Sequence, residues 1–240
     1  MSTPLLRTLV IDIGGTGIKT LLVNRDGKAL SRRRRERTPK PSTPSAVLAV
    51  VERMIDRHRT FQRVSVGFPG VVKNGVVRTA PNLGTEDWAG FELEKAVSSY
   101  TQTPVRAIND AELQGYGVIE GTGVEIVLTF GTGLGTALYV DGRLVPNLEL
   151  GHHPLRKNAT YEDLVNGKEL RRVGKKRWRG RVDLIIDTLG RIFNYDTLHI
   201  GGGNARHLKG PFPDSVRLFE SPEGLIGGIR LWPSGRRGSR

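Results

Sequence analysis

The sequence predicts an α/β protein built from two related lobes. Short strands rich in β-branched residues alternate with amphipathic helical segments along its 240 residues. Residues 10–28 and residues 127–143 both read as a strand, a Gly/Thr-rich turn, a second strand and an Asp-Gly hairpin turn. Two copies of one unit, in a chain long enough for two cores, favour a duplicated architecture over the convergence of two common glycine hairpins.

The composition narrows the class of protein. With 31 glycines added to the hydrophobic residues, the apolar share is that of an ordinary folded domain. The chain has no cysteine, which excludes disulfides, thiolate metal sites and cysteine nucleophiles. No stretch of 18 consecutive apolar residues is present, and the first ten residues lack the apolar run of a signal peptide. We therefore expect a soluble cytoplasmic protein with no membrane partner.

The first half of the chain predicts a mixed sheet with flanking helices. A Pro-rich connection at 38–44 leads into a helix at 45–57, for which Ser45 is the expected N-cap. Its predicted apolar stripe is Val47, Val50, Val51, Met54 and Ile55. Strands are expected at 5–13, 17–23, 30–35, 64–68, 76–77 and 105–108, and further helices at 90–99 and 110–118.

The second half repeats this alternation. Strands are expected at 126–130, 134–140 and 198–200, and helices at 161–165, 167–178, 181–193 and 224–232. The predicted lobes are therefore residues 1–109, completed by the helix at 224–232, and residues 110–223. Residues 233–240 have no periodicity and read as a disordered basic tail.

The formal net charge of +13 is concentrated in three runs. Residues 31–40 hold six basic residues and one acidic residue, and residues 168–181 hold eight basic residues and one acidic residue. Residues 230–240 hold four basic residues and no acidic residue. Local basic excess suits a polyanionic partner, whereas the simpler interpretation is solvated faces and a frayed tail. The middle run contains Trp178 on a helical pattern and is predicted to line a functional surface. Nucleic acid is disfavoured because no other aromatic residue is interleaved with it.

The two Gly/Thr turns are candidate phosphate sites. A tight turn between strands can present several backbone N–H groups to phosphate oxygens, and glycine lets the phosphate approach closely. Some of these glycines are also expected at positive φ. The candidate residues are Gly14, Gly15, Thr16 and Gly17 in the first turn and Gly131, Thr132 and Gly133 in the second.

Charged residues flank the first turn. Asp12 immediately precedes it and could hold Mg²⁺, through water, beside a bound phosphate, although an aspartate often only initiates a turn. Lys19 follows the turn and could reach a phosphate, although a lysine at a strand edge is the commoner interpretation.

Asn109 and Asp110 follow an apolar strand and precede a helix. A carboxylate at the carboxyl end of a strand can face the ligand crevice of an α/β sheet. Asp110 could there accept the proton of a hydroxyl that attacks phosphorus. The alternative, equally weighted from the residues, is that Asp110 caps the helix that begins at Ala111.

Polar loop residues could recognise sugar hydroxyl groups. Glu149 and His152 lie three residues apart in a loop, where one accepts a hydrogen bond and the other donates or accepts. Asn82, after Ala80-Pro81, is a further candidate, with a plain turn residue as the equal alternative.

Taken together, these motifs resemble the ROK family of sugar kinases. The segments follow the family's order: Asp12-Ile-Gly-Gly-Thr-Gly-Ile-Lys19, Gly67-Phe-Pro-Gly-Val71, Asn109-Asp-Ala111, Leu128-Thr-Phe-Gly-Thr-Gly133, Glu149-Leu-Gly-His152 and Gly201-Gly-Gly203. Further segments resemble the polyphosphate glucokinases of that family: Val76–Ala80, Val145–Glu149, Gly174–Trp178 and Ile200–Asn204. The similarity runs from about Leu6 to Trp232.

The resemblance implies an actin-like, ribonuclease-H-like two-lobed fold with a central cleft, and a homodimer. It implies Asp110 as the general base and glucose contacts from Asn82, Asn109, Asp110, Glu149 and His152. It implies phosphate contacts from the two turns, with Gly202 placed beside them. The family's Cys-rich zinc motif cannot exist here, and the stretch between His152 and Gly174 is short for the polyphosphate subgroup.

The function expected from this resemblance is Mg²⁺-dependent transfer of the terminal phosphoryl group of inorganic polyphosphate, and also of ATP, to the 6-hydroxyl of glucose. The basic run at 168–181 would then follow the long phosphate chain. The alternatives are a strictly ATP-dependent hexokinase of the same fold and a non-catalytic sugar-binding regulator. The second is disfavoured because the first strand begins by about Leu5, which leaves no room for a DNA-binding module before it.

Overall fold

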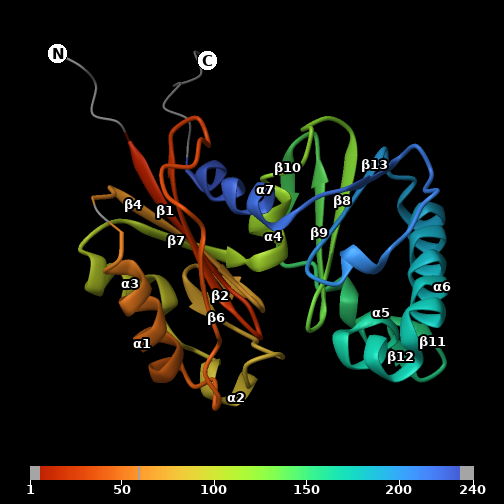
Figure 1. Cartoon of the computed structure of the whole chain (residues 1–240), viewed down its shortest axis with the longest axis horizontal. Coiled ribbons are helices and arrows are strands. Elements are labelled where there is room, and N and C mark those ends of the chain that lie inside the picture. The colour runs from red at the N-terminus through yellow and green to blue at the C-terminus, as the bar shows by residue number, and fades with distance from the viewer. Residues whose placement is uncertain (1–5, 59, 233–240) are drawn as a thin grey trace. The chain divides into compact units, whose positions relative to one another are not determined.

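The chain folds into two compact units. The structure, a computed structural model, describes residues 6–58 and 60–232 (Figure 1). Unit 1 takes the chain up to Gly117 and again from Pro222, and unit 2 spans Val118–Ser221. The basic tail expected at 233–240 lies outside the described residues. Within the described ranges, no helix combines the length and the apolar character needed to cross a membrane.

Unit 1 is organised by a five-stranded sheet in the order β3-β2-β1-β4-β7. β1, β2 and β3 are antiparallel, whereas β1, β4 and β7 are parallel, so that their carboxyl ends lie at one edge. The strands are β1 (Arg7–Ile13), β2 (Ile18–Asn24), β3 (Arg34–Glu36), β4 (Arg63–Phe68) and β7 (Val105–Asn109). β3 begins later than the strand predicted at 30–35, because the Leu22 N–H donates to the Ser31 side chain and the ladder with β2 starts only at Arg34.

Alternate residues of the first sheet pack into two cores. Leu9, Ile11 and Ile13 of β1 join the core that contains the buried stripe of helix α1, Val47, Val50, Val51, Met54 and Ile55, as predicted. Val10 points to the other face and packs with Leu113 and Leu225. The helices are α1 (Pro44–Ile55), α2 (Thr85–Trp88), α3 (Leu93–Thr101), α4 (Asp110–Gly115) and α7 (Ser221–Ile226). The two-residue strands β5 (Val72–Lys73) and β6 (Val76–Val77) form a hairpin, and a 3₁₀ turn, η3 (Gly227–Leu231), follows α7.

The N-cap of α1 is Thr43, so the prediction of Ser45 is wrong. The Thr43 side chain accepts a hydrogen bond from the Ala46 N–H, and Pro44 occupies the first helical position. Proline suits that position because its φ is already helical and its missing N–H would have no partner there. The helix must therefore begin at Pro44, one residue ahead of Ser45.

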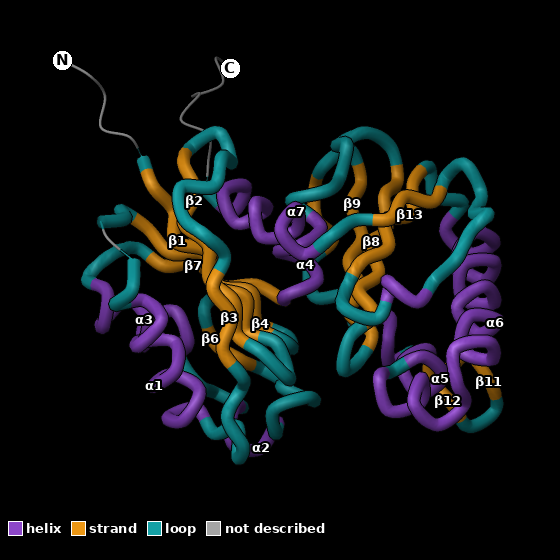
Figure 2. The backbone as a smooth tube through the Cα atoms, in the orientation of Figure 1, coloured by secondary structure: helices purple, strands orange, loops and turns teal. Residues whose placement is uncertain are grey.

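Unit 2 repeats the sheet of unit 1. Its strand order is β10-β9-β8-β13-β14, with β8, β9 and β10 antiparallel and β8, β13 and β14 parallel. Figure 2 labels its three middle strands, β9, β8 and β13. The strands are β8 (Val124–Phe130), β9 (Leu134–Val140), β10 (Arg143–Val145), β13 (Thr197–Gly201) and β14 (Val216–Leu218). A small hairpin of β11 (Pro154–Arg156) and β12 (Ala159–Thr160) is separate, and 3₁₀ turns are η1 (Leu150–His152) and η2 (Ala205–His207). The duplication predicted from the two hairpin units is confirmed.

One long, kinked helix covers a face of the second sheet. α6 (Gly167–Phe193) follows the short α5 (Tyr161–Val165) and joins the two helices predicted at 167–178 and 181–193. Its break is at Gly174, where φ is 75°, rather than between residues 178 and 181. Trp178 is fully buried, packs edge-on against Phe130 and donates its indole N–H to the Val165 carbonyl at 2.8 Å. The indole is therefore part of the core, and only the charged neighbours of Trp178 can line a surface.

Candidate active site

The first Gly/Thr turn joins β1 to β2. The Gly14 N–H donates to the Gly17 carbonyl at 3.1 Å, and the Thr38 hydroxyl donates to the Gly14 carbonyl at 2.5 Å. The N–H groups of Gly15, Thr16 and Gly17 have no acceptor within the described part of the chain. None of the three glycines has a positive φ, so that expectation is wrong. The turn is nevertheless a cluster of unpaired N–H donors, as an anion site requires.

Arg35 explains why position 17 is a glycine. A Cβ added to Gly17 would lie 2.7 Å from Nη2 of Arg35 and 2.9 Å from its Cζ. The guanidinium therefore rests directly on the turn, which only a residue without a side chain allows. Arg35 makes no ion pair among residues 6–58 and 60–232. The first turn thus combines amide donors with a positive charge available to a phosphate.

Asp12 and Lys19 face each other across β1 and β2, next to the turn. Nζ of Lys19 donates to Oδ2 of Asp12 at 2.6 Å, and the Asp12 side chain is 1% exposed. Lys19 is thus engaged by Asp12, whereas a direct phosphate contact was predicted for it. Oδ1 of Asp12 is buried without a hydrogen-bond partner.

That orphaned oxygen fits a hydrated Mg²⁺, because a water held by the ion would donate the missing hydrogen bond. No group of three or more histidine, aspartate or glutamate side chains that could hold a metal occurs in the described ranges. One carboxylate, waters and phosphate oxygens are a usual ligand set for Mg²⁺. Asp12 therefore remains the predicted magnesium residue.

Gly67 of β4, in the first sheet, is a neighbour of both Asp12 and Asp110. Gly67 pairs with Asp12 across β1 and β4, and a Cβ at Gly67 would lie 3.2 Å from the Asp110 Cα. The backbone of Asp110 thus packs on the glycine that is the strand neighbour of Asp12. Both carboxylates belong to the carboxyl edge of the parallel strands, where α/β sheets bind ligands.

Asn109, rather than Asp110, is the N-cap of α4. The Asn109 side-chain oxygen accepts from the N–H of Ala111 at 2.8 Å and of Glu112 at 3.2 Å, and Glu112 completes a capping box. Oδ1 of Asp110 also accepts from the Ala111 N–H, at 2.8 Å. The alternative in which Asp110 caps the helix is therefore wrong, because Asn109 occupies the cap position.

The loop that carries Asn82 packs near the same strand end. The Asn109 amide donates to the Gly70 carbonyl at 3.3 Å, and a Cβ at Gly70 would lie 3.2 Å from the Ala80 Cα. Asn82 is half-buried in the turn that follows Ala80, which the Leu83 N–H closes by donating to the Ala80 carbonyl. Unit 1 therefore gathers Asn82, Asn109 and Asp110 around the segment that ends β4.

The second turn, Gly131–Gly133, lies against the N-terminus of α6. The Gly131 N–H donates to the Gly133 carbonyl at 3.1 Å, which leaves the N–H groups of Thr132 and Gly133 without an acceptor in the described part of unit 2. The Gly167 N–H donates to the Thr132 carbonyl at 3.1 Å. The Asn204 amide donates to the Gly131 carbonyl at 2.8 Å. The helix N-terminus and the Asn204 side chain thus hold the backbone carbonyls of the turn in place.

Gly202 is needed where β13 passes the second turn. Its φ is +87°, and a Cβ there would lie 2.5 Å from the carbonyl oxygen of Phe130, the residue before Gly131. The structure therefore requires glycine at 202 for backbone packing beside the turn, and the phosphate contact predicted for Gly202 stays a prediction.

Glu149 and His152 lie beside the second turn in unit 2. Nε2 of His152 is 3.4 Å from Oε2 of Glu149, and a Cβ at Gly151 would lie 2.6 Å from the carbonyl of Leu134, the residue after the turn. Burial raises the pKa of Glu149. The charge of Glu162 raises it further, whereas His152 lowers it. A partly buried carboxylate beside an imidazole is a suitable pair of acceptor and donor for a sugar hydroxyl.

A basic face extends from the second turn along α6. Nη1 of Arg171 would lie 3.7 Å from a Cβ at Gly167. Lys175, Arg179 and Arg206 are close enough to His207 to lower its pKa, after the larger effect of burial. Lys175 and Arg179 are four residues apart in the part of α6 that follows the break at Gly174, so they share one side of the helix. Arg171 lies before that break. Nε of Arg179 is buried without a hydrogen-bond partner. We call Arg171, Lys175, Arg179, Arg206 and His207 the basic face.

The remaining charges of that run are used differently. Arg172 and Arg181 both bind Glu169, and these contacts lower the pKa of Glu169 to about 2. The run predicted as one functional surface therefore separates into a structural ion-pair network, the three cations that belong to the basic face, and three further exposed cations, Lys168, Lys176 and Arg177.

The sequence analysis missed several residues that border the turns. The sequence analysis treated Arg35 only as one member of the basic run at 31–40. It gave no role to Asn204, Arg206 or His207. A signal for Arg35 existed, since a three-residue strand beside β2 must alternate its side chains between the two faces. No pattern in the sequence could place η2 beside α6, because that contact joins segments about 30 residues apart.

Comparisons with known proteins place the chain among sequences of one family. The sequence model of the ROK family matches residues 8–162. Polyphosphate glucokinase of Mycobacterium leprae is 32% identical over 233 residues, which cover 90% of this chain and 72% of that protein. Polyphosphate glucokinase of Mycobacterium tuberculosis has the same identity over 90% of this chain and 88% of its own length.

A solved structure also matches. The inorganic polyphosphate/ATP-glucomannokinase from Arthrobacter sp. strain KM superposes with a TM-score of 0.84 and 27% identity, over 94% of this chain and 98% of that chain. The actin-like fold class expected from the sequence is thereby confirmed.

Proposed function

Because the chain belongs to the ROK family, we propose that it is a sugar phosphotransferase that moves the terminal phosphoryl group of inorganic polyphosphate to the 6-hydroxyl of glucose. ATP is a second donor in this proposal. The supporting relatives are the two mycobacterial polyphosphate glucokinases and the Arthrobacter polyphosphate/ATP-glucomannokinase.

The observation that carries the proposal is the position of Asp110. Its backbone packs on Gly67, the strand partner of Asp12, at the carboxyl edge of the first sheet. Asn109 supplies the helix cap. A half-buried carboxylate in that position, relieved of the capping role, suits the acceptance of a proton from an attacking hydroxyl.

The reaction can be written with these residues. The sugar hydroxyl oxygen attacks the terminal phosphorus, a new O–P bond forms, and the bond to the bridging oxygen of the donor breaks. The hydroxyl proton passes to the Asp110 carboxylate, and the shortened donor leaves with the electron pair. Asn82, Asn109, Glu149 and His152 hold the sugar hydroxyls, and the amides of the two turns bind phosphate oxygens. Mg²⁺ held through water by Asp12 would offset charge on the transferred group.

The basic face favours polyphosphate as the donor. It places four cationic side chains and His207 in one region of unit 2, and the Arg171 end adjoins the second turn. A donor of three phosphates can use only part of such a surface, whereas a long phosphate chain can contact all of it. Each phosphate neutralised releases a counterion, so affinity for the longer donor should fall more steeply with salt.

The experiment is a phosphorylation assay with purified protein, Mg²⁺ and glucose, run in parallel with ATP and long-chain polyphosphate over a range of salt concentrations. We expect turnover with both donors and a steeper salt dependence of KM for polyphosphate. Replacing Arg171, Lys175 and Arg179 by glutamine should flatten that slope. The matched control replaces Lys168, Lys176 and Arg177, three exposed cations of the same helix.

The outcomes separate the alternatives. Turnover with ATP alone would leave an ATP-dependent hexokinase. Equal slopes for both donors, or equal effects of the two triple variants, would remove the role of the basic face. Binding of glucose without turnover with either donor would favour a sugar-binding regulator.

A further inference from the structure

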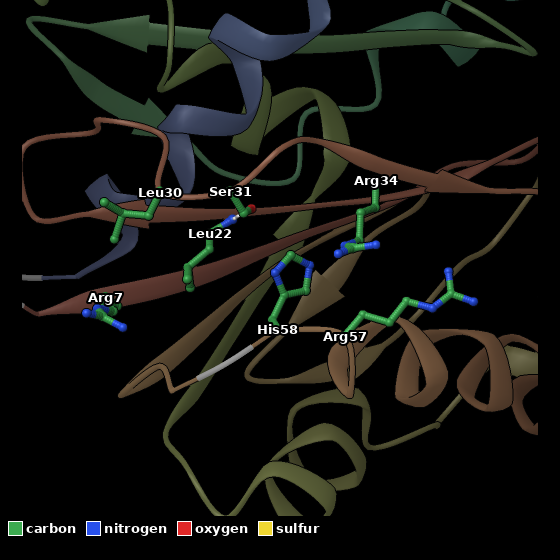
Figure 3. Close-up of a pocket in the computed structure, with 7 residues that line it drawn as sticks. All are labelled: Arg7, Leu22, Leu30, Ser31, Arg34, Arg57 and His58. Atoms are coloured by element: carbon green, nitrogen blue, oxygen red, sulfur yellow. Dashed lines mark hydrogen bonds between the residues drawn. The ribbon is translucent and has the colours of Figure 1, made fainter.

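A second basic site lies in unit 1. Figure 3 shows a pocket of about 410 Å³ lined by Arg7, Leu22, Leu30, Ser31, Arg34, Arg57 and His58. Its lining thus holds three guanidinium groups and an imidazole, and no carboxylate. Arg7 and Arg57 lie at its two ends, and Arg34 lies between them with its guanidinium directed towards His58.

The strand β3 separates this pocket from the first turn. Arg34 pairs with Thr20 of β2, whereas its neighbour Arg35 pairs with Lys19. Adjacent residues of a strand point to opposite faces of the sheet. Accordingly, Arg35 rests on Gly17 of the turn, and Arg34 lines the pocket together with His58, which contacts Thr20. The charged run at 32–37 therefore contributes to two different sites.

The positive charges of the pocket are only partly balanced. Arg57 binds Oε1 of Glu36 at 2.6 Å, but the other oxygen of that carboxylate is taken by Arg53, also at 2.6 Å. Nη1 of Arg7 donates to the neutral Thr60 hydroxyl at 3.0 Å. Arg34 has neither an ion pair nor a side-chain hydrogen bond within residues 6–58 and 60–232. Cations held together without counter-charges raise the local potential and attract an anion.

His58 adds a polar group at the wall of the pocket. The residue is 9% exposed, and its Nε2 is 2.8 Å from the Thr20 hydroxyl oxygen. Burial lowers the pKa of His58, and the nearby charge of Arg34 lowers it further. A negative ligand beside Arg34 would offset that second effect. The pKa of His58 should therefore change when an anion occupies the pocket.

We propose that this pocket binds a phosphate group, either as inorganic phosphate or as the phosphate of a small phosphomonoester. Guanidinium forks match phosphate oxygens in geometry and charge. The Ser31 hydroxyl, which accepts from the Leu22 N–H at 3.1 Å, keeps its own proton for donation. Leu22 and Leu30 provide an apolar wall, with Leu30 41% exposed, that an ester group could cover. The site is independent of the proposed kinase reaction.

The test follows the His58 ring by NMR in the full chain, while inorganic phosphate and, separately, glycerol 3-phosphate are added at constant ionic strength. The chain has five histidines, so the His58 signals can be assigned with a His58→Gln variant. We expect saturable shifts and a raised pKa of His58. Arg34→Gln should weaken phosphate binding about tenfold or more, because it removes a charged hydrogen-bond donor.

Arg35→Gln is the matched control, since it removes the same charge from the opposite face of the same strand. It should leave the His58 response unchanged while it alters donor use. Arg7→Gln gives a second pocket variant if Arg34→Gln is poorly folded. Tighter binding of glycerol 3-phosphate would assign a phosphomonoester, and tighter binding of phosphate would assign the free ion. The proposal would be overturned if the His58 signal did not respond to phosphate or responded equally to chloride. It would also be overturned if Arg34→Gln and Arg35→Gln weakened phosphate binding to the same extent.

Discussion

The two sheets share a backbone plan but differ in the side chains beside their turns. Both have the same strand order, and in both an antiparallel pair closes on a Gly/Thr turn with unpaired N–H groups. The register places Asp12 opposite Lys19 in unit 1, two residues outside the turn on either strand. The corresponding pair in unit 2 is Thr129 opposite Gly135. The duplication has preserved the amide donors, whereas the ion pair exists in one copy.

This difference suggests that the two turns have different roles in the proposed reaction. Each turn has an arginine nearby, Arg35 in unit 1 and Arg171 in unit 2, so both are suited to bind phosphate. Among the residues that the structure describes, only Asp12 beside the first turn is a buried carboxylate with an oxygen that lacks a hydrogen-bond partner. The proposed reaction would then use unit 1 for cation binding and proton transfer, and unit 2 for binding of the donor chain. Substitutions at matched positions can break this assignment.

The largest expected effect is that of Asp110→Asn. Loss of a general base lowers kcat by about 10²- to 10⁴-fold, and KM for glucose should change much less. Because Asn109 holds the cap of α4, the thermal stability of the variant should be close to that of the wild type. Steady-state kinetics and thermal unfolding measure both quantities. Near-normal turnover would reject Asp110 as the base.

Asn109→Ala is the control for that experiment. Losing an N-cap costs about 0.5–2 kcal/mol of stability, and Asn109 also donates to the Gly70 carbonyl. This variant should unfold at a lower temperature than Asp110→Asn. If Asp110→Asn were the less stable of the two, Asp110 would be structural.

The next effect in size is that of Asp12→Asn compared with Thr129→Val. If Asp12 holds Mg²⁺ through water, its loss should raise the Mg²⁺ concentration needed for half-maximal activity by about 10- to 100-fold, as for other groups one shell away from a metal. Thr129→Val, at the equivalent position of unit 2, should leave that concentration unchanged. A magnesium titration of both variants measures this concentration. Equal increases in the two variants would contradict the proposal that the magnesium residue belongs to unit 1.

The sequence was sufficient for features encoded by local periodicity. The stripe of α1, the duplicated hairpins and the bounds of α5 all follow from patterns within a few residues. Two predictions about caps and turns were wrong. Pro44 at the first helical position makes Thr43 the N-cap of α1, and no glycine of the two Gly/Thr turns has a positive φ. Close approach of Arg35, rather than backbone conformation, accounts for Gly17.

Long-range contacts decided what the sequence could not. Asp110 was equally well interpreted as a cap or a base, and the structure removes the first interpretation by placing Asn109 at the cap. The role of Asp110 as the base stays a prediction. The strand register places Lys19 opposite Asp12 and pairs the two, which the sequence did not indicate. The phosphate contact of Lys19 stays a prediction. Within the run at 168–181, only the three-dimensional position of Glu169 distinguishes arginines that stabilise the helix from those of the basic face.

The smallest expected effects concern two glutamates of unit 2. Glu169 has its pKa lowered to about 2 by hydrogen bonds from Arg172 and Arg181, so its ionised form stabilises the fold above its ordinary pKa of 4.5. Glu169→Gln should therefore lower Tm at pH 7 by about 2–4 °C, for a loss of about 1 kcal/mol, and the difference should vanish as the pH falls towards 2.

Glu149 should behave in the opposite way, because burial raises its pKa. Ionisation of Glu149 then costs stability at pH 7, and the cost is relieved as the pH falls through the raised pKa towards the ordinary value. Glu149→Gln should be slightly more stable than the wild type at pH 7 and equal to it in acid. As a sugar acceptor Glu149 must also be ionised, so KM for glucose should rise in the same acid range in the wild type but not in the variant. Thermal unfolding and kinetics between pH 4 and 8 test both statements, and a destabilised Glu149→Gln at pH 7 would assign this residue to the structure of the loop instead of the binding of sugar.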